Sequence, residues 1–223
     1  MTVGVVVPAA GRGERLGGDT PKALRSLAGE PLLVHAVRAL RRAPSVDVIV
    51  AAAPRGWVTR VEEYLSPFTV IVVEGGELRQ DSVALALAAL PDEVDLVLVH
   101  DAARCLTPPS VVEAVVAALR AGADAVVPVV AVSDTIKQVD GDRVRATLDR
   151  ASLRAVQTPQ GFRREVLAQA HAQARGRGLS TDDAALVEAL GRSVMTVPGS
   201  DEAFKVTGPV DLILAEAVLR ART

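Results

Sequence analysis

Short apolar runs alternate with segments of helical periodicity along most of the chain. The runs expected to form strands are Val3–Val7, Val46–Ala53, Thr69–Val73, Leu96–His100, Ala125–Val130 and Ser193–Val197. The segments expected to form helices are Leu32–Leu40, Val58–Tyr64, Ser82–Leu90, Pro109–Arg120 and Pro209–Arg220. Strands separated by helices predict a three-layer, Rossmann-like α/β fold, in which a mostly parallel sheet carries helices on both faces. We expect residues 1–223 to form a single domain, with Thr107 capping the fourth helix.

One segment interrupts this alternation. Asp140-Gly141-Asp142 separates two short strand candidates, Thr135–Val139 and Arg143–Thr147, and an Asp-Gly pair in that position predicts a hairpin. A β-arm at about 132–150 has little core of its own to bury. We therefore expect it to be the contact of a homodimer, and a solvated surface hairpin is the alternative.

Composition and charge exclude several classes of protein. Hydrophobic residues make up 49%, which is enough for a sizeable core, and the net charge of −2 gives no general attraction to nucleic acid or an anionic membrane. The single cysteine, Cys105, excludes a disulfide framework and favours a cytoplasmic location. The apolar runs fall far short of the ~20 residues that span a bilayer. Val3–Val7 has no basic region before it, so we expect a first strand and not a signal peptide.

The segment after the first expected strand, up to Lys22, is rich in small residues. Ligands of open α/β sheets bind beyond the carboxyl ends of the strands, and small residues let main-chain N–H groups approach phosphate oxygens. Arg15 and Lys22 add positive charge there. Leu16 stands where a dinucleotide-binding loop needs its third glycine, and the Gly-Lys-Ser/Thr of a Walker loop is missing. The segment predicts a phosphate-binding loop of another kind, formed by Pro8, Ala9, Ala10, Gly11 and Gly13.

A known family matches these residues. Ala9-Ala10-Gly11-x-Gly13-x-Arg15, followed by Pro21-Lys22, resembles the opening signature of the sugar-phosphate nucleotidyltransferases. Almost the whole chain, the β-arm included, is similar to the 2-C-methyl-D-erythritol 4-phosphate cytidylyltransferases of the non-mevalonate isoprenoid pathway. The resemblance implies that CTP and a sugar-alcohol phosphate react to give 4-diphosphocytidyl-2-C-methyl-D-erythritol and pyrophosphate. It also implies a homodimer.

A second glycine-containing segment follows the third expected strand and opens a helix. Its glycine N–H groups and a serine hydroxyl suit polar recognition, although Ser82 by itself is equally typical of an ordinary helix start. The resemblance implies that Gly76 and Ser82 recognise the cytosine base. The residues of this segment assigned to nucleotide binding are Gly75, Gly76, Asp81 and Ser82.

A polar cluster, His100 to Arg104, ends the fourth expected strand. An aspartate at that position can contact ribose hydroxyls or the magnesium of a triphosphate, whereas His100 alone is typical of a packed strand residue. The resemblance assigns Asp101 and Ala102 to the ribose or substrate, and Arg104 to the sugar phosphate. Cys105 stands where the family usually has proline, and we expect it to be structural.

Further substrate-binding residues rest on the resemblance alone. The matching positions here are Thr135, Arg150, Thr158, Thr181 and Lys205. From the residues themselves, Thr181 is a helix N-cap candidate, with Asp182 and Asp183 as favourable charges in the first turn. This local interpretation remains the main account of the two aspartates.

The chemistry requires positioning more than proton transfer. A phosphate monoester has a second pKa of about 6, so the nucleophile is already ionised at neutral pH, which agrees with the lack of a candidate general base. Arg15 and Lys22 are expected to stabilise the transition state, and Arg150 and Lys205 to hold the incoming phosphate. Mg²⁺ is expected on the CTP phosphates, with Asp101 as the one candidate protein ligand.

Two other functions remain open at this level. A ribitol-5-phosphate cytidylyltransferase would share most of the motifs and use another acceptor. A non-catalytic nucleotide-sensing module could keep the glycines, but it would not need the four cations Arg15, Lys22, Arg150 and Lys205.

Overall fold

The computed structural model describes residues 1–11, 20–174 and 182–222. Its central sheet has eight strands: β1 (Thr2–Pro8), β4 (Val48–Ala53), β5 (Ile71–Glu74), β6 (Val94–Val99), β7 (Ala125–Ala131), β10 (Arg154–Val156), β11 (Gln160–Arg163) and β12 (Val194–Pro198). They lie in the order β10-β7-β11-β6-β1-β4-β5, with β12 on the other side of β7 from this path. The pairs β1–β4, β1–β6, β4–β5 and β7–β12 are parallel, whereas β10 and β11 run antiparallel to their neighbours. The sheet is therefore mixed but mostly parallel, as predicted.

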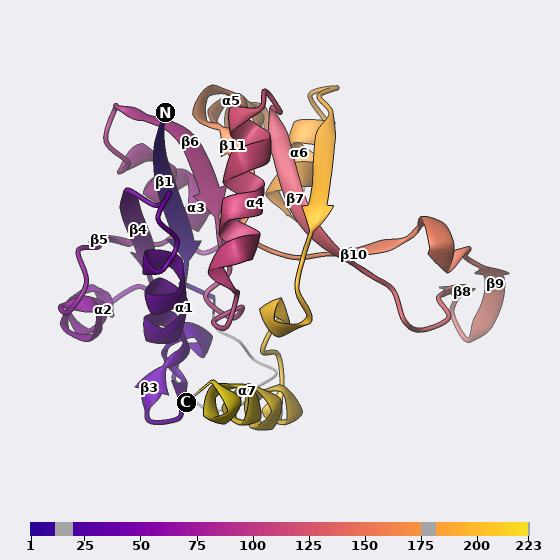
Figure 1. The fold of residues 1–223 in the computed structure, drawn as a ribbon, viewed down its shortest axis with the longest axis horizontal. Coiled ribbons are helices and arrows are strands. Elements are labelled where there is room, and N and C mark those ends of the chain that lie inside the picture. The colour runs from indigo at the N-terminus through magenta and orange to yellow at the C-terminus, as the bar shows by residue number, and fades with distance from the viewer. Residues whose placement is uncertain (12–19, 175–181, 223) are drawn as a thin grey trace.

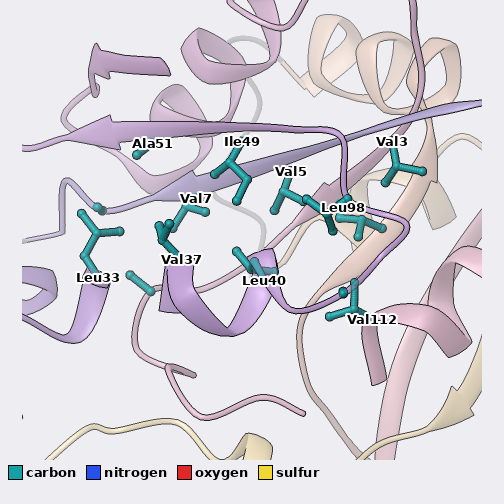
Figure 2. Close-up of a cluster of buried hydrophobic side chains, with 14 of the residues drawn as sticks. Val3, Val5, Val7, Leu33, Val37, Leu40, Ile49, Ala51, Leu98 and Val112 are labelled. Atoms are coloured by element: carbon teal, nitrogen blue, oxygen red, sulfur yellow. The ribbon is translucent and has the colours of Figure 1, made fainter. Parts of the chain in front are cut away.

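Helices cover both faces of this sheet, which confirms the three-layer prediction (Figure 1). On one face lie α1 (Leu32–Arg41), α2 (Val58–Leu65) and α4 (Pro109–Arg120), and on the other α3 (Arg79–Ala88), α5 (Arg164–Ala174) and α6 (Asp183–Glu188). Successive strand residues point to opposite faces, so Val5 joins the first core and Val6 the second. Figure 2 shows the first core, in which Leu33, Val37 and Leu40 of α1 pack beside the β1 valines and Ile49 of β4. Burying each such side chain contributes about 1.5–3 kcal/mol.

A smaller core forms at the end of the sheet toward which β1 points. It joins α7 (Pro209–Ala221) to α1 and to the hairpin of β2 (Ser26–Leu27) and β3 (Glu30–Pro31) through buried Leu27, Leu32, Leu106, Val206 and Ala215. Figure 1 shows α7 lying across this end of the molecule. The short 3-10 helices η2 (Lys22–Leu24) and η4 (Asp201–Ala203) precede the hairpin and α7, respectively. Val206 of this core follows Lys205 directly, whereas Ala23 and Leu24, which follow Lys22, belong to the first core.

The predicted β-arm is present. It consists of β8 (Lys137–Asp140) and β9 (Arg143–Thr147), paired antiparallel, followed by η3 (Arg150–Ser152). Figure 1 shows that the arm projects away from the sheet. Val139 and Val144 are 59% and 60% exposed, because the arm has no layer to pack against in its own chain.

Most expected elements lie within three residues of their observed bounds, and two local predictions differ. The helix expected over Ser82–Leu90 already begins at Arg79. Thr107 does not cap α4: the cap position is Pro108, and the Thr107 hydroxyl donates instead to the Arg104 carbonyl at 2.8 Å. Within the described ranges, the structure contains no helix long and apolar enough to cross a membrane.

Candidate active site at the carboxyl edge of the sheet

Three adjacent parallel strands, β4, β1 and β6, end at the same edge of the sheet. Beyond β1, the Ala9 N–H donates to the Ala52 carbonyl at 2.9 Å, and beyond β6, the His100 N–H donates to the Val6 carbonyl at 2.9 Å. These bonds fix the backbone where each strand leaves the sheet. The edge is therefore a rigid platform for the first residues of the following loops.

The Gly75-Gly76 turn contacts the loop after β1. A Cβ atom on Gly75 would lie 2.7 Å from Ala10 Cβ and 2.9 Å from Ser82 Oγ, so only glycine fits there. The Gly76 N–H donates to Ser82 Oγ at 3.2 Å, and Ser82 is 1% exposed. Residues predicted to bind the nucleotide thus lie side by side, and the Ser82 hydroxyl holds the turn in shape. The neighbouring Asp81 accepts from the Leu78 N–H at 3.3 Å, at the start of α3.

Asp101 is shared between two cations. Its Oδ2 lies 2.8 Å from Lys205 Nζ, and its Oδ1 lies 3.3 Å from Arg79 Nε. The side chain is only 12% exposed, and this burial alone would raise the pKa of the carboxyl. The charges of Arg79 and Lys205 outweigh burial and hold the pKa of Asp101 well below its ordinary value. The carboxylate is therefore ionised and fixed at the centre of the edge.

The backbone of Asp101 is held from below by Thr158 and His100. Thr158 Oγ1 accepts from the Asp101 N–H at 3.0 Å and lies 3.1 Å from His100 Nδ1. Both side chains are buried, and burial lowers the pKa of His100 to about 4. A neutral imidazole can accept the Thr158 proton at Nδ1. Thr158, predicted to bind substrate, thus supports the Asp101 loop with its hydroxyl.

Arg104 connects this loop to the segment that carries Lys205. Its Nη1 donates to the Ala203 carbonyl at 2.8 Å and its Nη2 to the Val156 carbonyl at 3.1 Å. Burial lowers the pKa of the Arg104 guanidinium. The Val206 N–H also donates to the Ala103 carbonyl at 2.8 Å. Lys205 is therefore held against Asp101 by backbone as well as by charge.

Lys22 is the first residue of η2. The N-terminus of α7 is closed by Asp211, whose Oδ2 accepts from Thr207 N and Oγ1, both at 2.6 Å, and from Gly208 N at 2.9 Å. These hydrogen bonds lower the pKa of Asp211, and the charge of Lys22 adds to the effect. Lys22 therefore lies close enough to the N-terminus of α7 for its charge to act on Asp211.

The structure does not bring every predicted residue to this edge. Thr135 is exposed at the base of the arm, and Arg150 of η3 donates through Nη1 to the Ser133 carbonyl at 2.6 Å. Both belong to the segment that leaves the sheet (Figure 1). Gly13, Arg15 and Thr181 lie outside the described residues.

Comparison with known proteins gives the site its chemical context. The family model for IspD, 2-C-methyl-D-erythritol 4-phosphate cytidylyltransferase, matches residues 3–221. The chain belongs to this family. A relative of the same name from Frankia casuarinae is 58% identical, with 97% of this chain and 81% of the relative covered. A second relative of this name, from Streptomyces coelicolor, is 52% identical, with 97% of this chain and 84% of the relative covered.

Solved structures agree with this assignment. The 2-C-methyl-D-erythritol 4-phosphate cytidylyltransferase of Thermus thermophilus has a TM-score of 0.81 and 40% identity, with 99% of this chain and 100% of that chain covered. The 4-diphosphocytidyl-2C-methyl-D-erythritol synthase of Anaerococcus prevotii has a TM-score of 0.86 and 26% identity, with 98% of both chains covered.

Family membership confirms three predictions from the sequence: the resemblance, the α/β fold and the activity of a cytidylyltransferase that uses CTP. The cytidylyltransferases of this family act on 2-C-methyl-D-erythritol 4-phosphate by name, so ribitol 5-phosphate is not the favoured acceptor.

Sequence reasoning missed a buried charge network beside the site. Asp183 lies in the first turn of α6, as expected, but the sequence does not reveal that it is 1% exposed and paired with Arg79 and His171. The cap of α6 is Asp182, whose Oδ1 accepts from the Ala185 N–H at 3.0 Å, and not Thr181. Arg79 lies in the glycine-containing segment from Gly75 to Ser82 that the sequence identifies as a nucleotide-binding candidate. The sequence does not indicate that Arg79 pairs with Asp101 and Asp183.

Proposed function

We propose that the chain transfers the cytidylyl group of CTP to 2-C-methyl-D-erythritol 4-phosphate at the carboxyl edge of the sheet. An oxygen of the acceptor phosphate attacks the α-phosphorus, a new P–O–P bond forms, and pyrophosphate leaves. The observation that carries this assignment is the pairing of Lys205 with the fixed Asp101 at the edge where the Gly75-Gly76 turn meets the loop after β1, in a chain of this family. Such an arrangement suits a reaction between two anions, in which positioning and charge neutralisation do most of the work.

The nucleotide side of the site is formed by the loop after β1 and the Gly75-Gly76 turn. Pro8, Ala9, Ala10 and Gly11 offer backbone close to the phosphates, and Gly13 and Arg15 continue this loop along the sequence. The turn held by Ser82 offers main-chain groups to the cytosine, and Asp101 and Ala102 lie where the ribose would contact the protein. Lys22 stabilises the negative charge that builds on the α-phosphate.

The acceptor side is formed around Lys205. The acceptor phosphate is largely ionised at neutral pH, so no base has to remove a proton before it attacks. Lys205 is 41% exposed, and its long side chain can turn from Asp101 toward the incoming phosphate. Arg104 and Thr158 keep the Asp101 loop and the Lys205 segment together through the hydrogen bonds described above.

The donor groups at this edge fit a magnesium ion carried mainly by the substrate. Mg²⁺ takes oxygen ligands and is commonly held by one or two carboxylates together with substrate phosphates. In the described part of the chain, no group of three or more His, Cys, Asp and Glu side chains could hold a metal ion. Asp101 would be the protein carboxylate nearest to such an ion. When bound with CTP, the ion would neutralise charge on the phosphate oxygens.

Two copies of the chain complete the site in this proposal. The arm carries Thr135 and Arg150 away from the edge that holds Lys205 (Figure 1), although both match family positions for the acceptor. An arm that reaches a second copy would place these residues at the partner's site and cover Val139 and Val144, which are exposed here. We therefore propose a homodimer in which each chain is one catalytic domain. The single cysteine, Cys105, supports the proposal that it works in the cytoplasm.

An acceptor assay tests the function. The protein is incubated with CTP, Mg²⁺ and either 2-C-methyl-D-erythritol 4-phosphate or ribitol 5-phosphate, and pyrophosphate release is measured. The methylerythritol phosphate should be preferred, and CTP should be preferred over ATP, GTP and UTP. Faster turnover of ribitol 5-phosphate would make it the acceptor in place of 2-C-methyl-D-erythritol 4-phosphate. CTP binding without turnover of either acceptor would indicate a nucleotide-sensing module.

A further inference from the structure

Arg79 is a cation at the site that the proposed reaction has not used. It is the first residue of α3, directly after the Gly75-Gly76 turn. Its Nε lies 3.3 Å from Asp101 Oδ1, and its Nη1 lies 2.7 Å from Asp183 Oδ2. One guanidinium thus connects the central carboxylate of the site to a second carboxylate on α6.

Asp183 is a firm anchor for this guanidinium. It is 1% exposed, and its other oxygen lies 2.9 Å from His171 Nε2 on α5. Burial would raise the pKa of Asp183, but the hydrogen bond to His171 and the charge of Arg79 hold it below its ordinary value. A buried carboxylate left without these partners would be strongly destabilising. The pairing therefore fixes the end of the Arg79 side chain.

Neighbouring contacts fix the anchor in turn. Gln160 of β11 donates through Nε2 to Asp182 Oδ2 at 2.7 Å and accepts from the Ala184 N–H through Oε1 at 3.2 Å. The start of α6 is thereby tied to the central sheet. Asp183 cannot move without disturbing this strand contact, so the position of Arg79 is set by the fold and not by the bound substrate.

The two oxygens of Asp101 face cations that differ in how freely their side chains can move. Oδ1 faces the anchored Arg79, and Oδ2 faces Lys205, which is more exposed and sits on a flexible side chain. If Lys205 turns to an acceptor phosphate, Asp101 loses one of its two cations. Arg79 remains in place, because its own anchor lies on the other side.

We propose that Arg79 is a positioning residue that holds the Asp101 carboxylate from the α6 side, so that Lys205 is released to the acceptor phosphate. This inference rests on the proposed reaction for the role of Lys205. Without Arg79, the Asp101 carboxylate would pair with Lys205 alone of these two cations. The stronger ion pair would keep the Lys205 ammonium away from the acceptor phosphate. The expected cost appears in acceptor binding and turnover, although Arg79 itself need not touch the acceptor.

The kinetic test replaces Arg79 in two backgrounds. Arg79→Lys keeps a charge beside Asp183, but one ammonium cannot serve two carboxylates as the planar guanidinium does. In the otherwise unchanged protein we expect KM for the acceptor to rise about tenfold and kcat to fall, a coupling typical of residues in one network. In a Lys205→Ala background the same replacement should change KM by less than about twofold, because there is no Lys205 left to release. An equal change in both backgrounds, or no change in either, overturns the proposal.

A matched control separates this role from plain stabilisation. Arg163 is also an ion-paired arginine, 3.7 Å from Asp124, with a side-chain exposure of 29% against 34% for Arg79. It lies beside Leu96, at the opposite end of β6 from Asp101. Arg163→Lys should leave both kinetic constants unchanged. If Arg79→Lys does not fold, Arg79→Gln combined with Asp183→Asn removes both partners of the buried pair, and the same kinetic comparison applies.

A second measurement needs no turnover. The chain has only three lysines, Lys22, Lys137 and Lys205, so acetylation of each can be followed by mass spectrometry, here without nucleotide or metal. Arg79→Lys introduces a new amine, so the Arg79→Gln, Asp183→Asn variant is used. Labelling of Lys205 relative to Lys137 of the arm should fall several-fold, because Asp101 holds its ammonium more tightly. If the relative labelling of Lys205 is the same in the variant and in the unchanged protein, the proposal is contradicted. If the labelling of Lys205 falls in the variant but the unchanged protein shows no transferase activity, only the proposed function is contradicted.

Discussion

Replacing His100 with asparagine should make the fold less sensitive to mild acid. His100 is fully buried beneath the Asp101 loop, and burial lowers its pKa from 6.5 to about 4 in the folded protein. The unfolded chain keeps the ordinary value and takes up a proton first as the pH falls. A depressed folded pKa therefore gives stability that is complete above pH 6.5 and is lost as the pH falls through about 4.

The size of the effect follows from the two pKa values. Each unit of difference corresponds to about 1.36 kcal/mol, so 6.5 against about 4 gives about 3.4 kcal/mol once both the unfolded and the folded state are protonated. At pH 4.5 about 2.5 kcal/mol of this has already been lost. Asparagine does not titrate, and its amide oxygen can accept a hydrogen bond near the position of Nδ1, where Thr158 lies at 3.1 Å.

The assay is urea unfolding of both proteins at pH 7.5 and at pH 4.5. His100→Asn is expected to be the less stable protein at pH 7.5, because it leaves a cavity. Between pH 7.5 and pH 4.5 the unchanged protein should lose about 2.5 kcal/mol more unfolding free energy than the variant. Other titrating groups cancel, since both proteins contain them. A difference that stays the same at both pH values would refute the argument that burial keeps His100 neutral.

Three further replacements test the site and the core. Lys22→Ala should lower kcat by ~10² or more without changing the circular dichroism spectrum, and near-normal turnover would remove Lys22 from the catalytic residues. Arg150→Ala should mainly raise KM for the acceptor, measured by pyrophosphate release at saturating CTP; a larger effect on KM for CTP would count against its role. Gly161→Ala should cost about 1–3 kcal/mol of stability, because the new Cβ would lie 2.4 Å from Val115 Cγ1, and an unchanged urea midpoint would show that α4 can yield.

Local patterns were sufficient for much of the fold. Apolar runs and helical periodicity identified the parallel strands, and the Asp-Gly pair identified the arm, because both signals depend on residues close in sequence. The antiparallel strands β10 and β11 were not predicted. β11 lies between β6 and β7 with Gln160, Gly161 and Phe162 buried, so it has no alternation of buried and exposed residues. Its glycine is required by close packing against α4, which the sequence does not reveal.

The site divides in the same way. The sequence by itself determined the small residues after β1, the glycine turn before α3 and the cations that a phosphate reaction needs, because each depends on residue type and on place after a strand. Only the tertiary structure decided which charges meet. Lys205 reaches Asp101, and Arg79 reaches Asp183, each across 104 residues of sequence. Such pairs form only when β6, α3, α6 and the segment before α7 pack side by side, and burial then makes the pairing obligatory, since a buried charge without a partner is too costly to keep.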